Sequence, residues 1–283
     1  MKNLIERTFF GALYVAVIIA GILWLPQYVF IGIFAIIMAL ALYEYYKLLN
    51  MGKIRTIGVI IFGELIYAIF AIGSALTIPH ADTICLVLFI LCWIVPFAMM
   101  VAEHWQQQPI NRNSLVTNFI AAMFWIIMPI SFLPYMLVNY PLVLLALFVI
   151  IWTNDTGAYC IGTLTAKLPG GNHKMAPKTS PKKSWEGLCG GILFALIAGY
   201  IFSLYVTEYT WWQWLLFALF VALVGTWGDL IESHVKRRAG VKDSGRFLPG
   251  HGGVLDRFDS LLLCLLVLAA IRYFMDYFVR WFS

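Results

Sequence analysis

Long apolar segments that follow one another along the chain constrain its fold most strongly. About nine stretches each approach the ~20 residues that a helix needs to cross the hydrocarbon core of a bilayer. A hydrophobic fraction of 62% and a mean hydropathy of +0.87 exclude an ordinary soluble domain. We therefore predict an all-α, polytopic integral membrane protein with about nine transmembrane helices. Their approximate bounds are Thr8–Leu25, Tyr28–Leu49, Ile57–Ile78, Thr83–Val101, Leu115–Val138, Leu142–Gly162, Trp185–Val206, Trp211–Ile231 and Val254–Tyr277.

The apolar segments continue along the whole chain, so we expect a single transmembrane domain over residues 1–283. Residues 1–140 would form N-terminal helices with short loops, and residues 141–283 would carry the catalytic loops. Lysines and arginines gather in alternate connections between the predicted spans, and the opposite connections contain none. The positive-inside rule then places the N-terminus and the basic loops in the cytoplasm. We expect an integral protein of the inner (cytoplasmic) membrane whose active site faces the cytoplasm.

One polar stretch, Ser233 to Asp259, interrupts the apolar pattern near the C-terminus. It contains six cationic residues, three carboxylates and five glycines between two apolar helices. Such a density of charge beside a bilayer is costly unless it binds something charged. The sequence therefore favours a site for phosphates and a metal ion. The alternative is a web of salt bridges that caps two transmembrane helices, which would explain some of the charges but not the glycines.

Carboxylates lie at both helix ends that flank this stretch. Asp229 would end one helix and Asp256 would begin the next, with Asp259 on the same face as Asp256. Asp229 and Asp256 could converge on Mg²⁺, which prefers one or two carboxylates together with substrate phosphate oxygens. The residues Asp229, Glu232, Ser233, Lys236 and Arg237 are spaced three or four apart, so they would form one stripe along the first helix.

A second polar segment lies between two earlier spans. Asp155 sits near membrane depth, where an unpaired carboxylate is expensive. Lys182, Lys183 and Ser184 come just before a predicted helix, and a helix N-terminus with nearby lysines can bind an anion. The same lysines could instead anchor the protein to acidic lipid headgroups. His251 could be a general base or a structural hydrogen-bond donor.

The stretch from Ser233 to Asp259 closely resembles the signature of the phosphatidate cytidylyltransferase family, also called CDP-diacylglycerol synthases. Three other segments resemble stretches that the family shares: Asn154 to Tyr159, Ser180 to Gly187, and Gly228-Asp229-Leu230. The signature elements present in this chain are Ser233, Lys236, Arg237, Lys242, Asp243, Gly245, Pro249, His251, Gly252, Gly253, Asp256, Arg257 and Asp259.

The resemblance implies a reaction of phospholipid biosynthesis in which CTP and phosphatidic acid give CDP-diacylglycerol and pyrophosphate. It also implies Mg²⁺ bound by Asp229 and Asp256, and a monovalent cation such as K⁺ beside it. A helical membrane fold, a homodimer and contact with membrane lipid are implied as well. No nucleic-acid partner is expected.

These expectations assign a role to each candidate residue. Asp155 and Asp259 would support the metal site or position water. Lys182, Lys183 and Ser184 would hold the lipid phosphate or the nucleotide. The triphosphate and the leaving pyrophosphate would be stabilised by Lys236, Arg237, Lys242 and Arg246. The predicted substrate-binding set is completed by Ser233, His251, Gly252, Gly253 and Arg257.

Three other functions compete with this hypothesis. A CTP-dependent lipid kinase would use the same nucleotide but transfer its γ-phosphate. A phosphatidyltransferase that uses CDP-lipids is disfavoured, because its D-G-x₂-A-R…G-x₃-D-x₃-D motif is absent. A transporter or flippase would place its charges near the bilayer midplane, whereas here they gather at one face.

Overall fold

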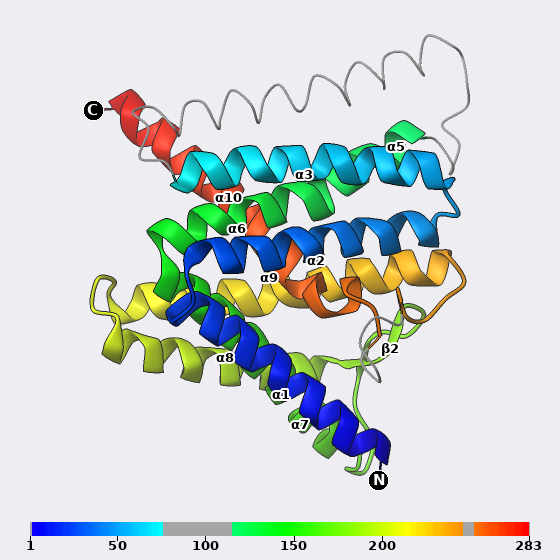
Figure 1. Ribbon diagram of the computed structural model, residues 1–283. Coiled ribbons are helices and arrows are strands. Elements are labelled where there is room, and N and C mark those ends of the chain that lie inside the picture. The colour runs from blue at the N-terminus through cyan, green and yellow to red at the C-terminus, as the bar shows by residue number, and fades with distance from the viewer. Residues whose placement is uncertain (1, 76–114, 246–251, 283) are drawn as a thin grey trace. The chain divides into compact units, whose positions relative to one another are not determined.

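The computed structural model describes residues 2–75, 115–245 and 252–282 and consists almost entirely of helices (Figure 1). The first three helices are α1 (Lys2–Leu23), α2 (Gln27–Leu48) and α3 (Lys53–Ala75). Next, α5 (Leu115–Ala122) continues through a π-helical turn, η1 (Met123–Ile127), into α6 (Met128–Asn139). The remaining elements are α7 (Pro141–Thr165), strands β1 (Lys174–Ala176) and β2 (Ser180–Ser184), α8 (Trp185–Tyr205), α9 (Trp211–Arg238) and α10 (Leu255–Phe282).

Six helical stretches in the described part of the chain are long and apolar enough to cross a membrane. They are α2, α3, the continuous stretch Asn118–Asn139, α7, α8 and α9. The prediction of an all-α membrane protein is thus confirmed in this coarser form. Every predicted span outside 76–114 coincides with a helix. The span Thr83–Val101 lies outside the described residues, and α1 and α10 are not among the six, so the count of about nine stays a prediction.

The chain folds as two compact units, the first made of residues 1–23 and 140–264 and the second of residues 24–139 and 265–283. In the second unit, α3 packs against α2 and α6. Its α2 helix buries large apolar side chains, among them Phe34, Met38, Leu42 and Tyr46. All the predicted site residues that the structure describes belong to the first unit. The single transmembrane domain over residues 1–283 stays a prediction.

Small residues let the helices of the first unit approach closely. A methyl group added to Gly157 of α7 would lie 2.8 Å from the carbonyl oxygen of Gly190 in α8. One added to Gly199 of α8 would lie 2.7 Å from Cβ of Ala218 in α9. Lipid tails are as apolar as these helices, so close van der Waals contact at small residues drives their association. The series α7, α8 and α9 is therefore tightly packed.

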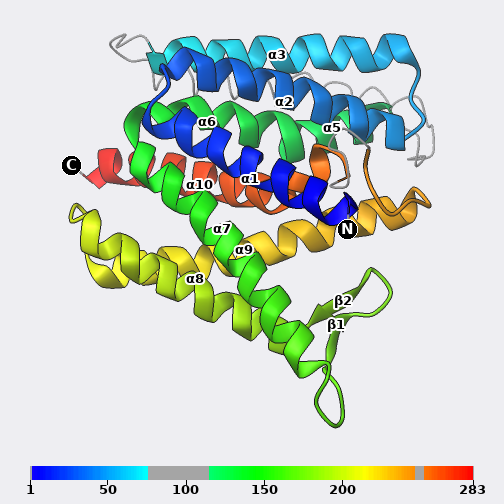
Figure 2. The ribbon, with the colours of Figure 1, turned by 60° about the horizontal axis from the view of Figure 1, so that its bottom comes forward.

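A short antiparallel β-hairpin joins α7 to α8, which the prediction of an all-helical chain did not include (Figure 2). Glu186 at the start of α8 holds it, since its Oε1 lies 2.6 Å from Nδ1 of His173. Ser184 caps α8, because its side-chain oxygen accepts a hydrogen bond from the backbone N–H of Gly187. The hairpin lies at the same end of the first unit as the C-terminal end of α9 (Figure 2).

Candidate functional site

Close packing of α9 on α10 brings two distant parts of the sequence together. A methyl group added to Gly228 would lie 2.6 Å from the backbone oxygen of Asp259 and 3.2 Å from Cα of Ser260. Only a residue without a side chain permits this approach. As a result, Asp229 on α9 and Asp259 on α10 lie beside one another.

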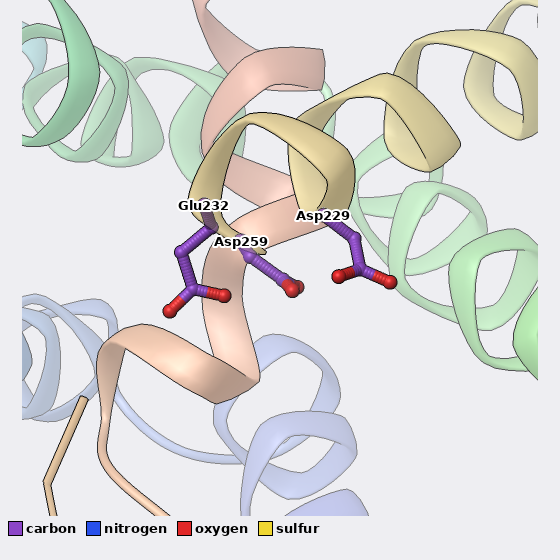
Figure 3. A group of neighbouring side chains, drawn as sticks. All are labelled: Asp229, Glu232 and Asp259. Carbon is purple, nitrogen blue, oxygen red and sulfur yellow. The ribbon is translucent and has the colours of Figure 1, made fainter. Parts of the chain in front are cut away.

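Three carboxylates converge at this contact, and we call Asp229, Glu232 and Asp259 the acidic cluster. One oxygen of each lies within 4.8 Å of the others. Asp229 and Glu232 are three residues apart, so both project from one face of α9. The carboxylate of Asp259 lies between the other two (Figure 3).

Glu232 is the most deeply buried member of the acidic cluster. Its exposed fraction is 0%. One carboxylate oxygen, Oε2, accepts a hydrogen bond from Nζ of Lys236 at 2.9 Å. The other, Oε1, is buried and has no hydrogen-bond partner among the residues that the structure describes. A buried carboxylate oxygen without a partner is expensive, so Glu232, which adjoins the carboxyl of Asp259, requires either a cation or a proton shared with Asp259.

Asp229 has a cation and a hydroxyl group as partners. Nζ of Lys183, in strand β2, lies 2.8 Å from Oδ2 of Asp229 and donates a hydrogen bond to the backbone oxygen of Thr226 at 3.0 Å. The hydroxyl of Ser233 donates to Oδ1 of Asp229 at 3.1 Å. Lys183 therefore connects the hairpin to the acidic cluster.

Asp256 makes a different set of contacts from the other acids. Its Oδ1 lies 2.5 Å from Nζ of Lys236, and its Oδ2 accepts from the backbone N–H groups of Ser244 at 2.9 Å and Gly253 at 2.8 Å. Gly252 has a φ of +85°, a conformation that favours glycine. Asp256 thus ties both described ends of the polar loop to Lys236. Its predicted role as a metal ligand stays a prediction.

The acidic cluster fits a divalent cation of the Mg²⁺ type. Hard cations take carboxylate oxygens, and Mg²⁺ usually binds one or two of them and keeps positions for phosphate or water. Asp229 and Asp259 are partly exposed, whereas Glu232 is buried and its Oε1 has no hydrogen-bond partner among the described residues. The described residues therefore provide both an open side for a ligand and a buried oxygen that lacks a partner.

Asp155 and Arg257 lie near the acidic cluster without joining it. Both line one cavity together with Asp256 and Asp259. Asp155 also interacts electrostatically with Asp229 and Lys183. The structure therefore brings the predicted Asp155 and Asp259 to the same cavity.

Other predicted residues have contacts that neither require nor exclude a ligand. Lys182 and Lys242 are exposed. Arg237 is exposed too, and it donates hydrogen bonds to the backbone oxygens of Thr179 and Val241. Their assignment to phosphate groups stays a prediction. The predicted residues Arg246 and His251 lie outside the described residues.

Glu232 is the site residue that the sequence-based prediction missed. It appeared in the stripe along α9 but received no role. Its spacing of three from Asp229 was a signal, since both had to share a helix face. Its burial and its proximity to Asp259 depend on the packing of α9 on α10, which spacing alone does not give.

Comparison with protein families identifies the group to which this chain is related. The pattern described as "Cytidylyltransferase family" matches residues 5–275. The chain belongs to the cytidylyltransferase family. The predicted family membership is thus confirmed.

Individual members of the cytidylyltransferase family support a more specific comparison. A protein of Staphylococcus saprophyticus named phosphatidate cytidylyltransferase is 44% identical over 119 residues, which is 42% of this chain and 44% of that protein. A protein of the same name from Staphylococcus aureus strain COL is 47% identical over 120 residues, with the same two shares. The matched segment thus spans less than half the length of these relatives.

Proposed function

We propose that this member of the cytidylyltransferase family transfers CMP from CTP to phosphatidate, which gives CDP-diacylglycerol and pyrophosphate. The observation that carries the proposal is the convergence of Asp229, Glu232 and Asp259 beside Lys183 and Lys236. Metal-binding acids with neighbouring cations suit a phosphate-transfer reaction. The names of the relatives point to the same reaction.

The proposed reaction is a displacement at one phosphorus atom. A phosphate oxygen of phosphatidate attacks the α-phosphorus of CTP, and a new P–O bond forms. The bond from the α-phosphorus to the oxygen that bridges it to the β-phosphorus breaks, and its electron pair leaves with pyrophosphate. Because the attacking phosphate is already anionic, it needs alignment and charge neutralisation more than a strong base.

The acidic cluster would hold Mg²⁺, with Glu232 as the buried ligand and Asp229 and Asp259 at the open side. Bound there, the ion would neutralise phosphate charge and orient the phosphates. Asp256, whose oxygens contact Lys236, Ser244 and Gly253, would have to share one of them with the ion. A monovalent cation such as K⁺ beside it is part of the same proposal.

Basic residues of this chain would neutralise the remaining charge. Lys236 lies between the carboxylates of Glu232 and Asp256, so its charge is held beside the acidic cluster. Arg237, Lys242 and Arg246 are assigned to the triphosphate and pyrophosphate. Lys182, Lys183 and Ser184 are assigned to the lipid phosphate or the nucleotide, and Asp155 to the support of the metal site or to positioning water.

The setting of the reaction is also proposed. The protein lies in the inner membrane, its loops face the cytoplasm where CTP is available, and it forms a homodimer. Support comes from the basic residues, which fall in alternate connections of the predicted spans. The bacterial origin of the relatives agrees with such a membrane.

Labelled CTP tests the proposed reaction with purified protein, phosphatidate and Mg²⁺. We expect label from the α-phosphate to appear in the lipid, and label from the γ-phosphate to appear in pyrophosphate. Label from the γ-phosphate in the lipid would establish the lipid kinase and overturn the proposal. An Asp229→Asn variant that kept full turnover would also contradict it.

A further inference from the structure

A cavity inside the first unit adjoins the acidic cluster. It has a volume of about 330 Å³ and is lined by residues of α1, α7 and α10. The polar part of its lining includes Asp155, Arg257 and Asp259. The cavity therefore reaches the place where the proposed chemistry would occur.

The α1 side of this cavity is apolar, although none of the predicted site residues lies on α1. Phe10, Gly11, Tyr14 and Val15 line it. Residues at these spacings share one face of a helix. This helix face is apolar except for the hydroxyl of Tyr14, which interacts electrostatically with Arg257, Asp259 and Asp155.

Aromatic contacts fix this wall in place. The ring of Tyr14 lies edge-on to Trp152 of α7, at 5.9 Å between centroids, and edge-on to Phe258 of α10, at 5.7 Å. Edge-to-face pairs at these distances are favourable. Tyr14 therefore holds α1 against both helices that carry the charged lining.

We propose that this cavity binds the glycerol ester region and the first acyl carbons of the phosphatidate substrate, and that Gly11 and Val15 determine how much lipid fits. The inference rests on the proposed function. The lipid phosphate would lie toward Arg257 and the ion held by the acidic cluster. The acyl carbons would lie against the apolar face of α1.

Lipid is the substrate that matches this lining. A phosphatidate molecule has an anionic end and an apolar end, as the cavity has a charged side and an apolar side. CTP has no apolar end that would contact Phe10 and Val15. A cytosine base stacked on Tyr14 or Trp152 is the competing occupant, and the experiment below separates the two.

Filling the cavity from α1 tests the proposal through the two Michaelis constants. Gly11→Leu and Val15→Phe should raise KM for phosphatidate about tenfold, since a change of a few methyl groups in an apolar pocket has this size of effect. KM for CTP and kcat should change little. Val17→Phe is the matched control, because Val17 is on the same helix but is 38% exposed.

A rise in KM for CTP alone would show that the base occupies the cavity and would overturn the proposal. Unchanged constants in both cavity-filling variants would overturn it as well. An equal rise in KM for phosphatidate in Val17→Phe would also overturn the proposal, because the effect would then not be specific to the cavity.

Fluorescence quenching provides a second test that needs neither turnover nor an α1 variant. Phosphatidate brominated on its acyl chains should quench tryptophan fluorescence, and this quenching should saturate with lipid concentration. The variant Trp152→Phe should lose the saturable part of the quenching. Phosphatidylcholine with the same brominated chains should not produce it. Quenching that is unchanged in Trp152→Phe contradicts the proposed cavity.

The two proposals fail in distinguishable ways. Saturable quenching through Trp152 without transfer of CMP would contradict the proposed reaction but support the proposed lipid cavity. Transfer of CMP with no change in KM in Gly11→Leu or Val15→Phe, and none in quenching in Trp152→Phe, would support the proposed reaction but contradict the proposed cavity.

Discussion

Glu232 shows how burial gives one carboxylate a special place among several. Its side chain is fully buried, Lys236 binds only one of its oxygens, and the other oxygen has no partner in the described part of the chain. Leaving such an atom unsatisfied costs about 1–3 kcal/mol or more. A bound cation would remove this cost, so Glu232 is a proposed ligand rather than a purely structural acid.

The substitution Glu232→Gln tests this role. It keeps the size of the side chain but removes its negative charge. We expect the Mg²⁺ concentration for half-maximal activity to rise by about tenfold or more. The matched control is Glu208→Gln, since Glu208 is exposed between α8 and α9. An unchanged Mg²⁺ dependence would show that Glu232 only pairs with Lys236 and is not a metal ligand.

Asp256 illustrates the opposite case, a carboxylate whose two oxygens are both occupied. Lys236 and Asp256 have side chains exposed by only 11% and 7%. Breaking a buried ion pair by changing one partner costs about 3 kcal/mol. We therefore expect Asp256→Asn to lower the midpoint of thermal unfolding by several degrees. Asp243→Asn, at an exposed position in the same loop, should leave it unchanged.

Activity and stability together separate the two roles of Asp256. A lower unfolding midpoint supports its role as a tether of the polar loop. An unchanged midpoint together with a higher Mg²⁺ concentration for half-maximal activity would support the metal role that the sequence predicts.

At the scale of elements, the contact between α9 and α10 determines the geometry of the acidic cluster. We expect Gly228→Ala to reduce turnover about 100-fold, because a displacement of about 1 Å at a site can have this effect. The new methyl group would meet backbone atoms of α10, which cannot rotate away.

Gly225→Ala is the control for this contact. Gly225 lies on the same helix, but a methyl group there would have its nearest neighbour, Cβ of Ser260, at 3.4 Å, which is an ordinary contact. An equal loss of turnover in both variants would show that α9 tolerates no added methyl group at either position. That result would contradict a specific role for Gly228.

The helices were predictable from sequence because hydropathy determines them locally. Trp185 and Trp211 begin predicted spans and also begin α8 and α9. The hairpin was not predictable in the same way, since β1 and β2 have only 3 and 5 residues and contain lysines and a proline instead of an apolar alternation. Its position depends on contacts such as Lys183 with Asp229.

The site was predictable in its composition but not in its pairings. Asp256 and Lys236 were identified from the polar stretch, and Asp229 from the helix end just before it. The pairing of Lys236 with Asp256, and of Asp229 with Glu232 and Asp259, depends on the distance between α9 and α10. That distance follows from the contact at Gly228, which the sequence showed only as part of a short motif.

At the scale of the whole molecule, the position of the chain in the membrane can be predicted from α8. Its 21 residues span about 31 Å at 1.5 Å per residue, close to the ~30 Å of the hydrocarbon core. The hairpin precedes α8 and Glu208 follows it. The two should therefore lie on opposite sides of the bilayer, with the hairpin in the cytoplasm.

Cysteine labelling checks this orientation. In a background without the native cysteines, we expect an impermeant thiol reagent to label Glu208→Cys from outside intact cells. Lys178→Cys, in the hairpin, should react only after the membrane is opened. The reverse pattern would place the acidic cluster away from cytoplasmic CTP.

Ion binding is the most direct test of the central claim that α9 and α10 together form a metal site. Mn²⁺ accepts the same oxygen ligands as Mg²⁺ and is visible by electron paramagnetic resonance. We predict that purified protein binds Mn²⁺, that Mg²⁺ displaces it, and that Asp229→Asn and Asp259→Asn each lose this binding while Glu208→Gln retains it. Undiminished Mn²⁺ binding by the double variant Asp229→Asn and Asp259→Asn would contradict the account.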